Sequence, residues 1–147
     1  MIERGLRRAM PDGLRAWALA GSPEGRYLAI HVADPLTRRV LRRMAARAAA
    51  QDTRRAPAQA VVAVGAERLY VFGLGDVQRA GGAEEGAPAP ALELALGDVS
   101  VEVATGVLWR RLRLRAAGLT CTLFLNMLGA GRKRPRALLA ALAGART

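Results

Sequence analysis

The sequence predicts an α+β fold in which an antiparallel β-meander is followed by one closing helix. The first observation is the alternation of apolar and polar residues, with period two, in several short segments between residues 59 and 125. The second is the short turn signals that separate these segments, such as those at 65–67 and 117–118. The third is a helical stretch over 134–143 that starts close to Pro135.

Six segments are expected to form the strands of the meander. They are 59–64, 68–74, 92–96, 99–103, 111–115 and 119–125. In the last four, the Leu and Val residues share one face, so each of these strands is expected to be half-buried. The Gly-, Ala-, Pro- and Glu-rich segment 75–91 has no hydrophobic period, and it predicts a loop.

The expected strand registers agree with one another. A tight turn near Gly106 and a two-residue turn at 117–118 keep the charged residues on the outer face, whereas a slip of one residue would bury the arginines. The resulting pairs are Glu102 with Arg111, Asp98 with Arg115, Thr120 with Arg115 and Thr122 with Arg113. This agreement supports an antiparallel meander.

The N-terminal third is predicted to be basic and mainly helical. Residues 2–19 suggest a short helix that Pro11 interrupts, and residues 26–32 alternate well enough for a first strand. We therefore divide the chain into a basic N-terminal helical segment, 1–55, and an antiparallel β domain with a C-terminal helix, 56–147.

A second helix is expected over residues 35–51. Asp34 followed by Pro35 suits an N-cap and a first helical position. The apolar stripe of this helix consists of Leu36, Val40, Leu41, Met44 and Ala48. Arginines line its flanks: Arg38, Arg39, Arg42, Arg43 and Arg47.

Charge is unevenly distributed along the 147 residues, which carry a formal net charge of +11. Residues 1–55 hold 12 basic and 5 acidic residues, residues 56–105 hold 2 and 7, and residues 106–147 hold 9 and none. A basic head, an acidic middle and a basic tail indicate internal electrostatic matching together with surplus positive surface.

The residues that usually carry catalysis are scarce. His31 is the single imidazole, and Cys121 is the single thiol, placed on the inward face of its strand. No GxSxG, HExxH or P-loop motif is present. The sequence therefore predicts no enzyme, no metal site and no cofactor, and a buried structural role for Cys121.

Two basic constellations are candidate binding sites for an anionic partner. The first is the arginine face of the 35–51 helix, represented by Arg39 and Arg43. The second combines strand arginines with a cluster at the start of the last helix: Arg111, Arg113, Arg115, Arg132, Lys133, Arg134 and Arg136. Arg binds carboxylate and phosphate through paired hydrogen bonds, although solvated helix faces and cross-strand ion pairs are the simpler interpretation.

The element order resembles the bacterial pleckstrin-homology-like domains and, more loosely, GRAM domains. The resemblance rests on the tight hairpin VVAVGAERLYVF over 61–72, four further meandering strands, and a closing helix whose apolar face is Leu138, Leu139 and Leu142. It implies a bent, partly open barrel plugged by that helix, with the 34–51 helix as an addition. Members of this family bind phosphoinositides, peptides or other proteins. Lipid-binding members use basic residues of the first hairpin, where this chain offers Glu67 and only Arg68.

The function expected from these features is a non-enzymatic interaction module. Its partner would be an acidic protein or an anionic membrane surface, reached from the cytoplasm and, for a membrane, peripherally. The alternative is a nucleic-acid-binding protein that uses the same arginines for phosphate contacts. Only six aromatic residues occur in the chain, too few to predict a base-stacking platform.

Overall fold

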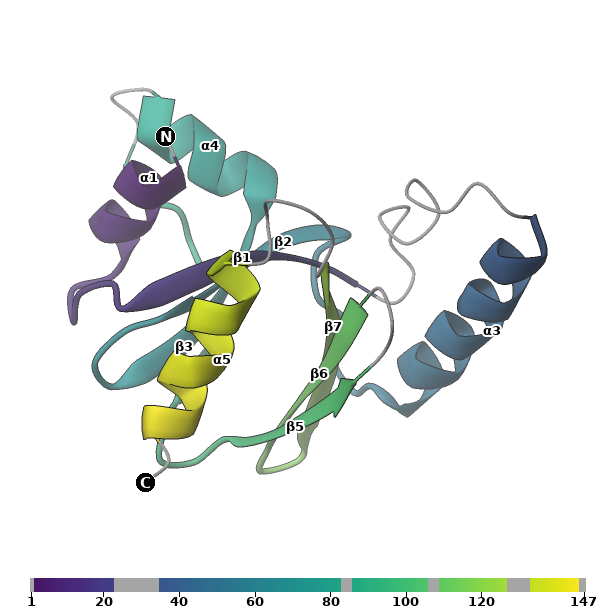
Figure 1. Cartoon of the computed structure of the whole chain (residues 1–147). Helices are drawn as coiled ribbons and strands as arrows, with labels where there is room; N and C mark the ends of the chain where they lie inside the picture. The colour runs from purple at the N-terminus through teal and green to yellow at the C-terminus, as the bar shows by residue number, and fades with distance from the viewer. Residues whose placement is uncertain (1, 23–34, 83–85, 106–108, 127–132, 146–147) are drawn as a thin grey trace.

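The computed structural model describes residues 2–22, 35–82, 86–105, 109–126 and 133–145. These residues form an α+β fold with one antiparallel sheet (Figure 1). The helices are α1 (Ile2–Ala9), α3 (Pro35–Gln51), α4 (Leu74–Gly82) and α5 (Lys133–Ala145). The strands are β1 (Ala16–Gly21), β2 (Gln59–Val64), β3 (Arg68–Gly73), β4 (Leu92–Ala95), β5 (Ser100–Thr105), β6 (Trp109–Ala116) and β7 (Leu119–Asn126). The expected strands of the meander and the two later helices are confirmed, with shifts of one or two residues at their ends.

The sheet is strongly curled but not closed into a barrel. Its strand order is β4-β3-β2-β1-β7-β6-β5, so β4 and β5 are the two edges. Six strand spacings of about 4.8 Å would separate these edges by roughly 29 Å in a flat sheet. The chain passes from Ala95 to Ser100 directly, and such a segment spans at most roughly 18 Å. The two edges must therefore approach each other at this end, where Leu96 and Val99 are buried in the core.

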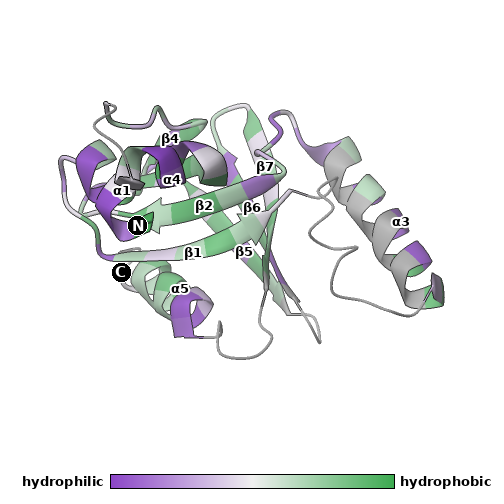
Figure 2. Ribbon diagram, turned by 90° about the horizontal axis from the view of Figure 1, so that it is seen from above, coloured by the Kyte–Doolittle hydropathy of each residue, from purple (hydrophilic) through white to green (hydrophobic). Residues whose placement is uncertain are grey.

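Two hydrophobic cores lie on opposite faces of the sheet. Helix α5 fills the curled face with Leu138 and Leu142, against inward side chains of all seven strands or the turns beside them. On the other face, α1 and α4 cover β1, β2 and β3 (Figure 2). The residues of this second core are Leu6, Met10, Trp17, Val61, Ala63, Tyr70, Phe72 and Val77.

The expected helix over 2–19 is wrong beyond Ala9. Residues 16–21 form β1, which pairs with β2 along its whole length and with β7 at Ala20 and Gly21. Because both faces of β1 are covered, its sequence AWALAG is apolar throughout and shows no alternation. Such a run does not distinguish a buried strand from a buried helical turn. The division at residue 55 stays a prediction, although the first segment supplies this central strand.

The expected loop over 75–91 is also wrong in its first half. Residues 74–82 form α4, whose buried residues Val77, Ala80 and Gly81 face α1 and the sheet. The two helices approach closely at Gly5, where an added Cβ would lie 2.3 Å from the Val77 carbonyl oxygen. A stripe made of one valine and small residues has too little hydrophobic contrast to predict a helix.

The β5–β6 register differs from the expected one by two residues. Glu102 lies opposite Arg113, Ala104 opposite Arg111 and Ser100 opposite Arg115. A two-residue shift keeps every side chain on its expected face, so alternation does not distinguish the two registers. The β6–β7 register is confirmed, with Thr120 opposite Arg115 and Gly118 in the turn at φ 71°.

Helix α3 is confirmed over Pro35–Gln51, and the segment after it returns to the sheet at β7. Thr53 and Arg54 donate backbone hydrogen bonds to the Thr120 carbonyl, at 3.0 and 3.2 Å. Asp52 accepts hydrogen bonds from the Thr122 amide and hydroxyl, at 3.0 and 2.7 Å. These contacts cover part of the β7 edge that β1 leaves unpaired. The expected strand over 26–32 lies outside the described residues.

Candidate basic pocket between the first helix and the last

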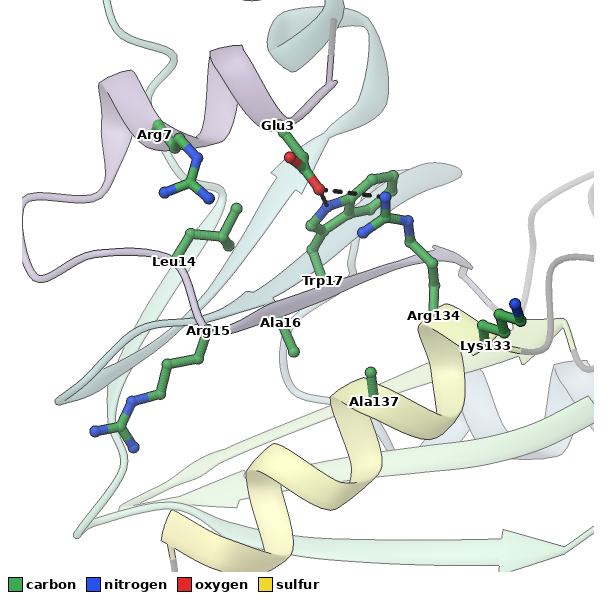
Figure 3. A pocket seen from close by; sticks show the side chains of 9 residues that line it. All are labelled: Glu3, Arg7, Leu14, Arg15, Ala16, Trp17, Lys133, Arg134 and Ala137. Atoms are coloured by element: carbon green, nitrogen blue, oxygen red, sulfur yellow. Dashed lines mark hydrogen bonds and ion pairs between the residues drawn. The ribbon is translucent and has the colours of Figure 1, made fainter.

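A pocket of about 460 Å³ lies where α1, the start of β1 and the start of α5 meet (Figure 3). Its apolar lining comes from Leu14, Ala16, Trp17 and Ala137. Its charged lining comes from Glu3, Arg7, Arg15, Lys133 and Arg134. Four cations and one carboxylate therefore surround a mainly apolar floor.

The centre of the pocket wall is a contact among Glu3, Trp17 and Arg134. The Trp17 indole N–H donates a hydrogen bond to Glu3 Oε1 at 3.3 Å, and Arg134 Nη2 lies 3.2 Å from the same oxygen. The Arg134 guanidinium also lies over the Trp17 ring, 3.9 Å from its centroid. Strand β7 pairs with β1 only at Ala20 and Gly21, so one edge of the first half of β1 is not paired with β7. Arg134 passes this edge to reach Trp17.

Glu3 is held in its ionised form by these neighbours. The hydrogen bond from Trp17 is the largest influence, and it lowers the pKa of Glu3 below 4.5. Desolvation opposes this shift, whereas the positive charges of Arg134 and Arg7 add to it. The contact shows how this pocket accommodates a carboxylate, with one oxygen facing an indole N–H and a guanidinium.

Among the described residues, the other three cations, Arg7, Arg15 and Lys133, form no ion pair with a carboxylate, although Arg7 contributes to the lowered pKa of Glu3. Arg7 and Arg15 are exposed. Arg7 lies above Leu14, whereas Arg15 and Lys133 lie at opposite ends of the pocket (Figure 3). Lys133 begins α5, where the positive end of the helix macrodipole adds to the same potential. The rim of the pocket is thus suited to several carboxylates spaced along an extended ligand.

The pocket wall at Leu14 and Arg15 is fixed by a second polar cluster. Asp12 accepts hydrogen bonds from the Tyr70 hydroxyl at 2.8 Å and from the Glu67 amide at 3.0 Å. Burial raises the pKa of Asp12, but these hydrogen bonds outweigh it, and the pKa lies below 3.8. Burial and the Asp12 carboxylate raise the pKa of Tyr70 to about 12. Gly65 leaves room for this cluster, because a Cβ there would lie 2.3 Å from the Asp12 carboxylate and would displace it from its hydrogen bonds.

The structure brings together two members of the expected cluster at the start of the last helix. Lys133 and Arg134 line the pocket, Arg136 is exposed on α5, and Arg132 lies outside the described residues. No carboxylate is close to Arg134 in the sequence, yet Glu3 pairs with it in the fold. Sequence reasoning missed Glu3, Arg7, Arg15 and Trp17 as pocket residues. Their clustering depends on α1 folding back over β1, for which no local pattern exists.

The strand arginines lie elsewhere, on the outer face of β6, and each is in a different environment. Arg113 is 8% exposed, and its Nε donates a long hydrogen bond of 3.4 Å to the Thr122 hydroxyl. Arg115 pairs with Glu102 at 3.4 Å, and both side chains are half-exposed. Arg111 is partly buried opposite Phe124, which is itself buried. The structure places these three arginines in one row along β6, apart from the pocket.

Arg39 and Arg43 form part of a separate surface. Both are exposed on α3. In both views α3 lies beyond the half of the sheet that holds β5, β6 and β7, whereas α1 and α4 lie at the other half (Figures 1 and 2). The pocket and α3 are therefore two distinct basic surfaces rather than one continuous patch.

The single thiol of the chain does not line the pocket. Cys121 is buried in the sheet core, as expected, and burial raises the pKa of its thiol to about 11. Across the described residues, no three His, Cys, Asp or Glu side chains are placed to hold a metal ion. His31 lies outside them. Within the same ranges, no helix is both long and apolar enough to cross a membrane.

No protein-family model matches this chain, and no curated protein matches it.

Proposed function

We propose that this chain is a non-enzymatic interaction module that binds an acidic segment of a partner protein in the pocket between α1, β1 and α5. The observation that carries the proposal is the group of three cations, Arg7, Arg15 and Lys133, around an apolar floor. Among the described residues, no carboxylate pairs with them. Because Glu3 already forms an ion pair with Arg134, the carboxylates of a ligand would pair with the other three cations. Arg pairs well with carboxylates, and the apolar lining between the charges, where Leu14 is partly exposed and Ala137 is exposed, suits a peptide.

The architecture supports a pleckstrin-homology-like module. Strands β1 to β4 and β5 to β7 form two meanders that join where β1 pairs with β7. The sheet curls until its edge strands approach, and α5 fills the curl. This is the element order of the family that the sequence resembles. In this proposal the protein works in the cytoplasm, where thiols such as that of Cys121 are kept reduced and form no disulfide.

Two matched variants test the proposal. The pocket variant carries Arg7→Gln, Arg15→Gln and Lys133→Gln, and the helix variant carries Arg39→Gln, Arg43→Gln and Arg47→Gln. Both variants lower the net charge equally, and the Arg residues that they replace are exposed. The probe is a fluorescein-labelled, glutamate-rich peptide with interspersed leucines, and its binding is followed by fluorescence anisotropy.

The pocket variant is expected to bind the peptide about threefold to 100-fold more weakly than the parent, since each of three exposed ion pairs contributes roughly 0.2–1 kcal/mol. The helix variant is expected to keep most of the affinity. Equal losses in both variants would indicate attraction to net charge alone and would reject the pocket as the site. Tighter binding of duplex DNA than of peptide, lost in the pocket variant and steeply salt-dependent, would replace the proposal with nucleic-acid binding.

A further inference from the structure

Helix α3 presents an unusual exposed stripe. Leu36, Val40, Arg43 and Arg47 are spaced by four, three and four residues, so they lie along one side of the helix. All four are exposed, with Leu36 at 70% and Val40 at 57%. The predicted apolar stripe is therefore not buried against the sheet at these two positions. The start of the stripe is aliphatic and its end is basic, with Arg39 exposed beside it.

The electrostatics of α3 are unfavourable in isolation. Residues 35–51 contain five arginines and no acidic residue. Arg39 and Arg43, and Arg43 and Arg47, are like charges four residues apart, which destabilise a helix. The first turn of the helix carries no carboxylate, so only Asp34, the expected N-cap, would offset the positive end of the macrodipole. An anionic surface that lay along this helix would relieve these repulsions.

We propose that α3 is a membrane-surface helix that lies on an anionic bilayer. Leu36 and Val40 enter the boundary between headgroups and acyl chains, and Arg39, Arg43 and Arg47 contact lipid phosphates. Helices that bind in this plane combine aliphatic side chains with Lys or Arg, and their affinity sums apolar burial and charge attraction. Both views place α3 beside the sheet, so a flat surface could lie along it without displacing the core (Figures 1 and 2).

Two other occupants fit α3 less well. A second copy would have to present carboxylates, but Glu93, Glu102 and Asp76 are already paired with arginines of their own chain. Of the other described carboxylates, Glu67 and Asp98 are exposed on two short turns, whereas a bilayer presents a continuous anionic surface. An acidic protein interface is usually anchored by aromatic side chains, whereas α3 offers only aliphatic residues between its arginines. A bilayer needs no such anchor and supplies many phosphates at once.

The test is co-sedimentation with vesicles of phosphatidylcholine and phosphatidylglycerol, and with vesicles of phosphatidylcholine alone. The parent is expected to bind the anionic vesicles much more strongly than the neutral ones. The helix variant is expected to lose about 100-fold in partitioning, since each basic residue near an anionic surface contributes roughly a factor of five. The pocket variant, which has the same net charge, is expected to bind nearly as well as the parent.

A second variant, Leu36→Ser with Val40→Ser, tests the apolar part. It retains all the charges, and it is expected to bind anionic vesicles about tenfold more weakly and to become more sensitive to salt, because only the apolar contribution is unscreened. The proposal would be overturned if the helix variant or the Leu36/Val40 variant bound anionic vesicles as strongly as the parent. It would also be overturned if the pocket variant lost as much binding as the helix variant, or if the parent bound neutral vesicles as strongly as anionic ones. The peptide experiment is independent, since it addresses the other basic surface.

Discussion

The two halves of the sheet differ in how they are covered. Strands β1, β2 and β3 lie between α5 on one face and α1 with α4 on the other. Strands β5, β6 and β7 turn one face into the core that also holds Leu138 and Leu142 of α5, and they carry arginines, threonines and Glu102 on the other. At the edge of this second half, Val103 is 45% exposed even on the inward side. Stability is therefore concentrated in the first half, which also positions the pocket, whereas the second half offers polar surface.

The largest expected difference between the halves concerns core truncation. Phe72→Ala, in the core under α1 and α4, is expected to cost about 3–5 kcal/mol, because Phe72 is fully buried and leaves a cavity. Val103→Ala in β5 is expected to cost less than about 1 kcal/mol, since nearly half of its side chain already meets water. Chemical denaturation of both variants measures these costs. Similar costs would contradict the comparison.

A smaller effect is expected at Asp12, which ties the segment before β1 to the β2–β3 hairpin. Its folded pKa is depressed, so its contribution is complete above the unfolded value of about 3.8 and is lost as the pH falls through the folded value. Asp12→Asn is expected to cost about 1–2 kcal/mol near neutral pH, through weakened hydrogen bonds with Tyr70 and Glu67.

Melting curves between about pH 5 and about pH 2 measure this dependence. The parent should lose stability faster than the Asp12→Asn variant as the pH falls, so that their melting temperatures converge. Glu102→Gln, which removes a half-exposed ion-pair partner in the second half, serves as the control and should follow the parent. A constant gap between the parent and Asp12→Asn across this range would contradict the assigned role.

The smallest effect compares two ion pairs of similar length and exposure, one in each half. Arg134 lies 3.2 Å from Glu3 and Arg115 lies 3.4 Å from Glu102, but only Arg134 also stacks on an aromatic ring. Arg134→Gln is expected to cost about 0.5–1 kcal/mol through the lost stacking on Trp17. Arg115→Gln is expected to cost less than about 0.5 kcal/mol. Equal melting temperatures for the two variants would show that the stacking contributes nothing.

The difference between the halves also explains which elements sequence patterns predict. Strands β5, β6 and β7 carry mainly polar residues on their outer face, even where Arg113 and Thr122 are buried there. Apolar and polar residues therefore alternate, and the strands are visible in the sequence. Strand β1 is dry on both faces, and its uniform AWALAG run suggested a helix instead. Helix α4 was missed because its buried stripe consists of Val77 and small residues.

The candidate site was predictable only in part, for a related reason. The basic cluster that holds Lys133 and Arg134 is local, so charge counting finds it. The partners Glu3 and Trp17 come from the opposite end of the chain, and their contact with Arg134 depends on how α1 and α5 lie relative to β1. The exposure of Leu36 and Val40 is likewise a tertiary property, because a helical stripe alone does not say what covers it.

The pairing of β1 with β7 has a consequence for biosynthesis. A ribosome makes β1 long before it makes β7 and α5, so this apolar strand leaves the exit tunnel without its second neighbour and without the helix that covers its inner face. Hairpins such as β2–β3 have a short turn and form locally, and β2 can shelter one edge of β1 at that point. The other edge stays open until residues 119–145 emerge, which leaves the growing chain vulnerable to misassociation until then.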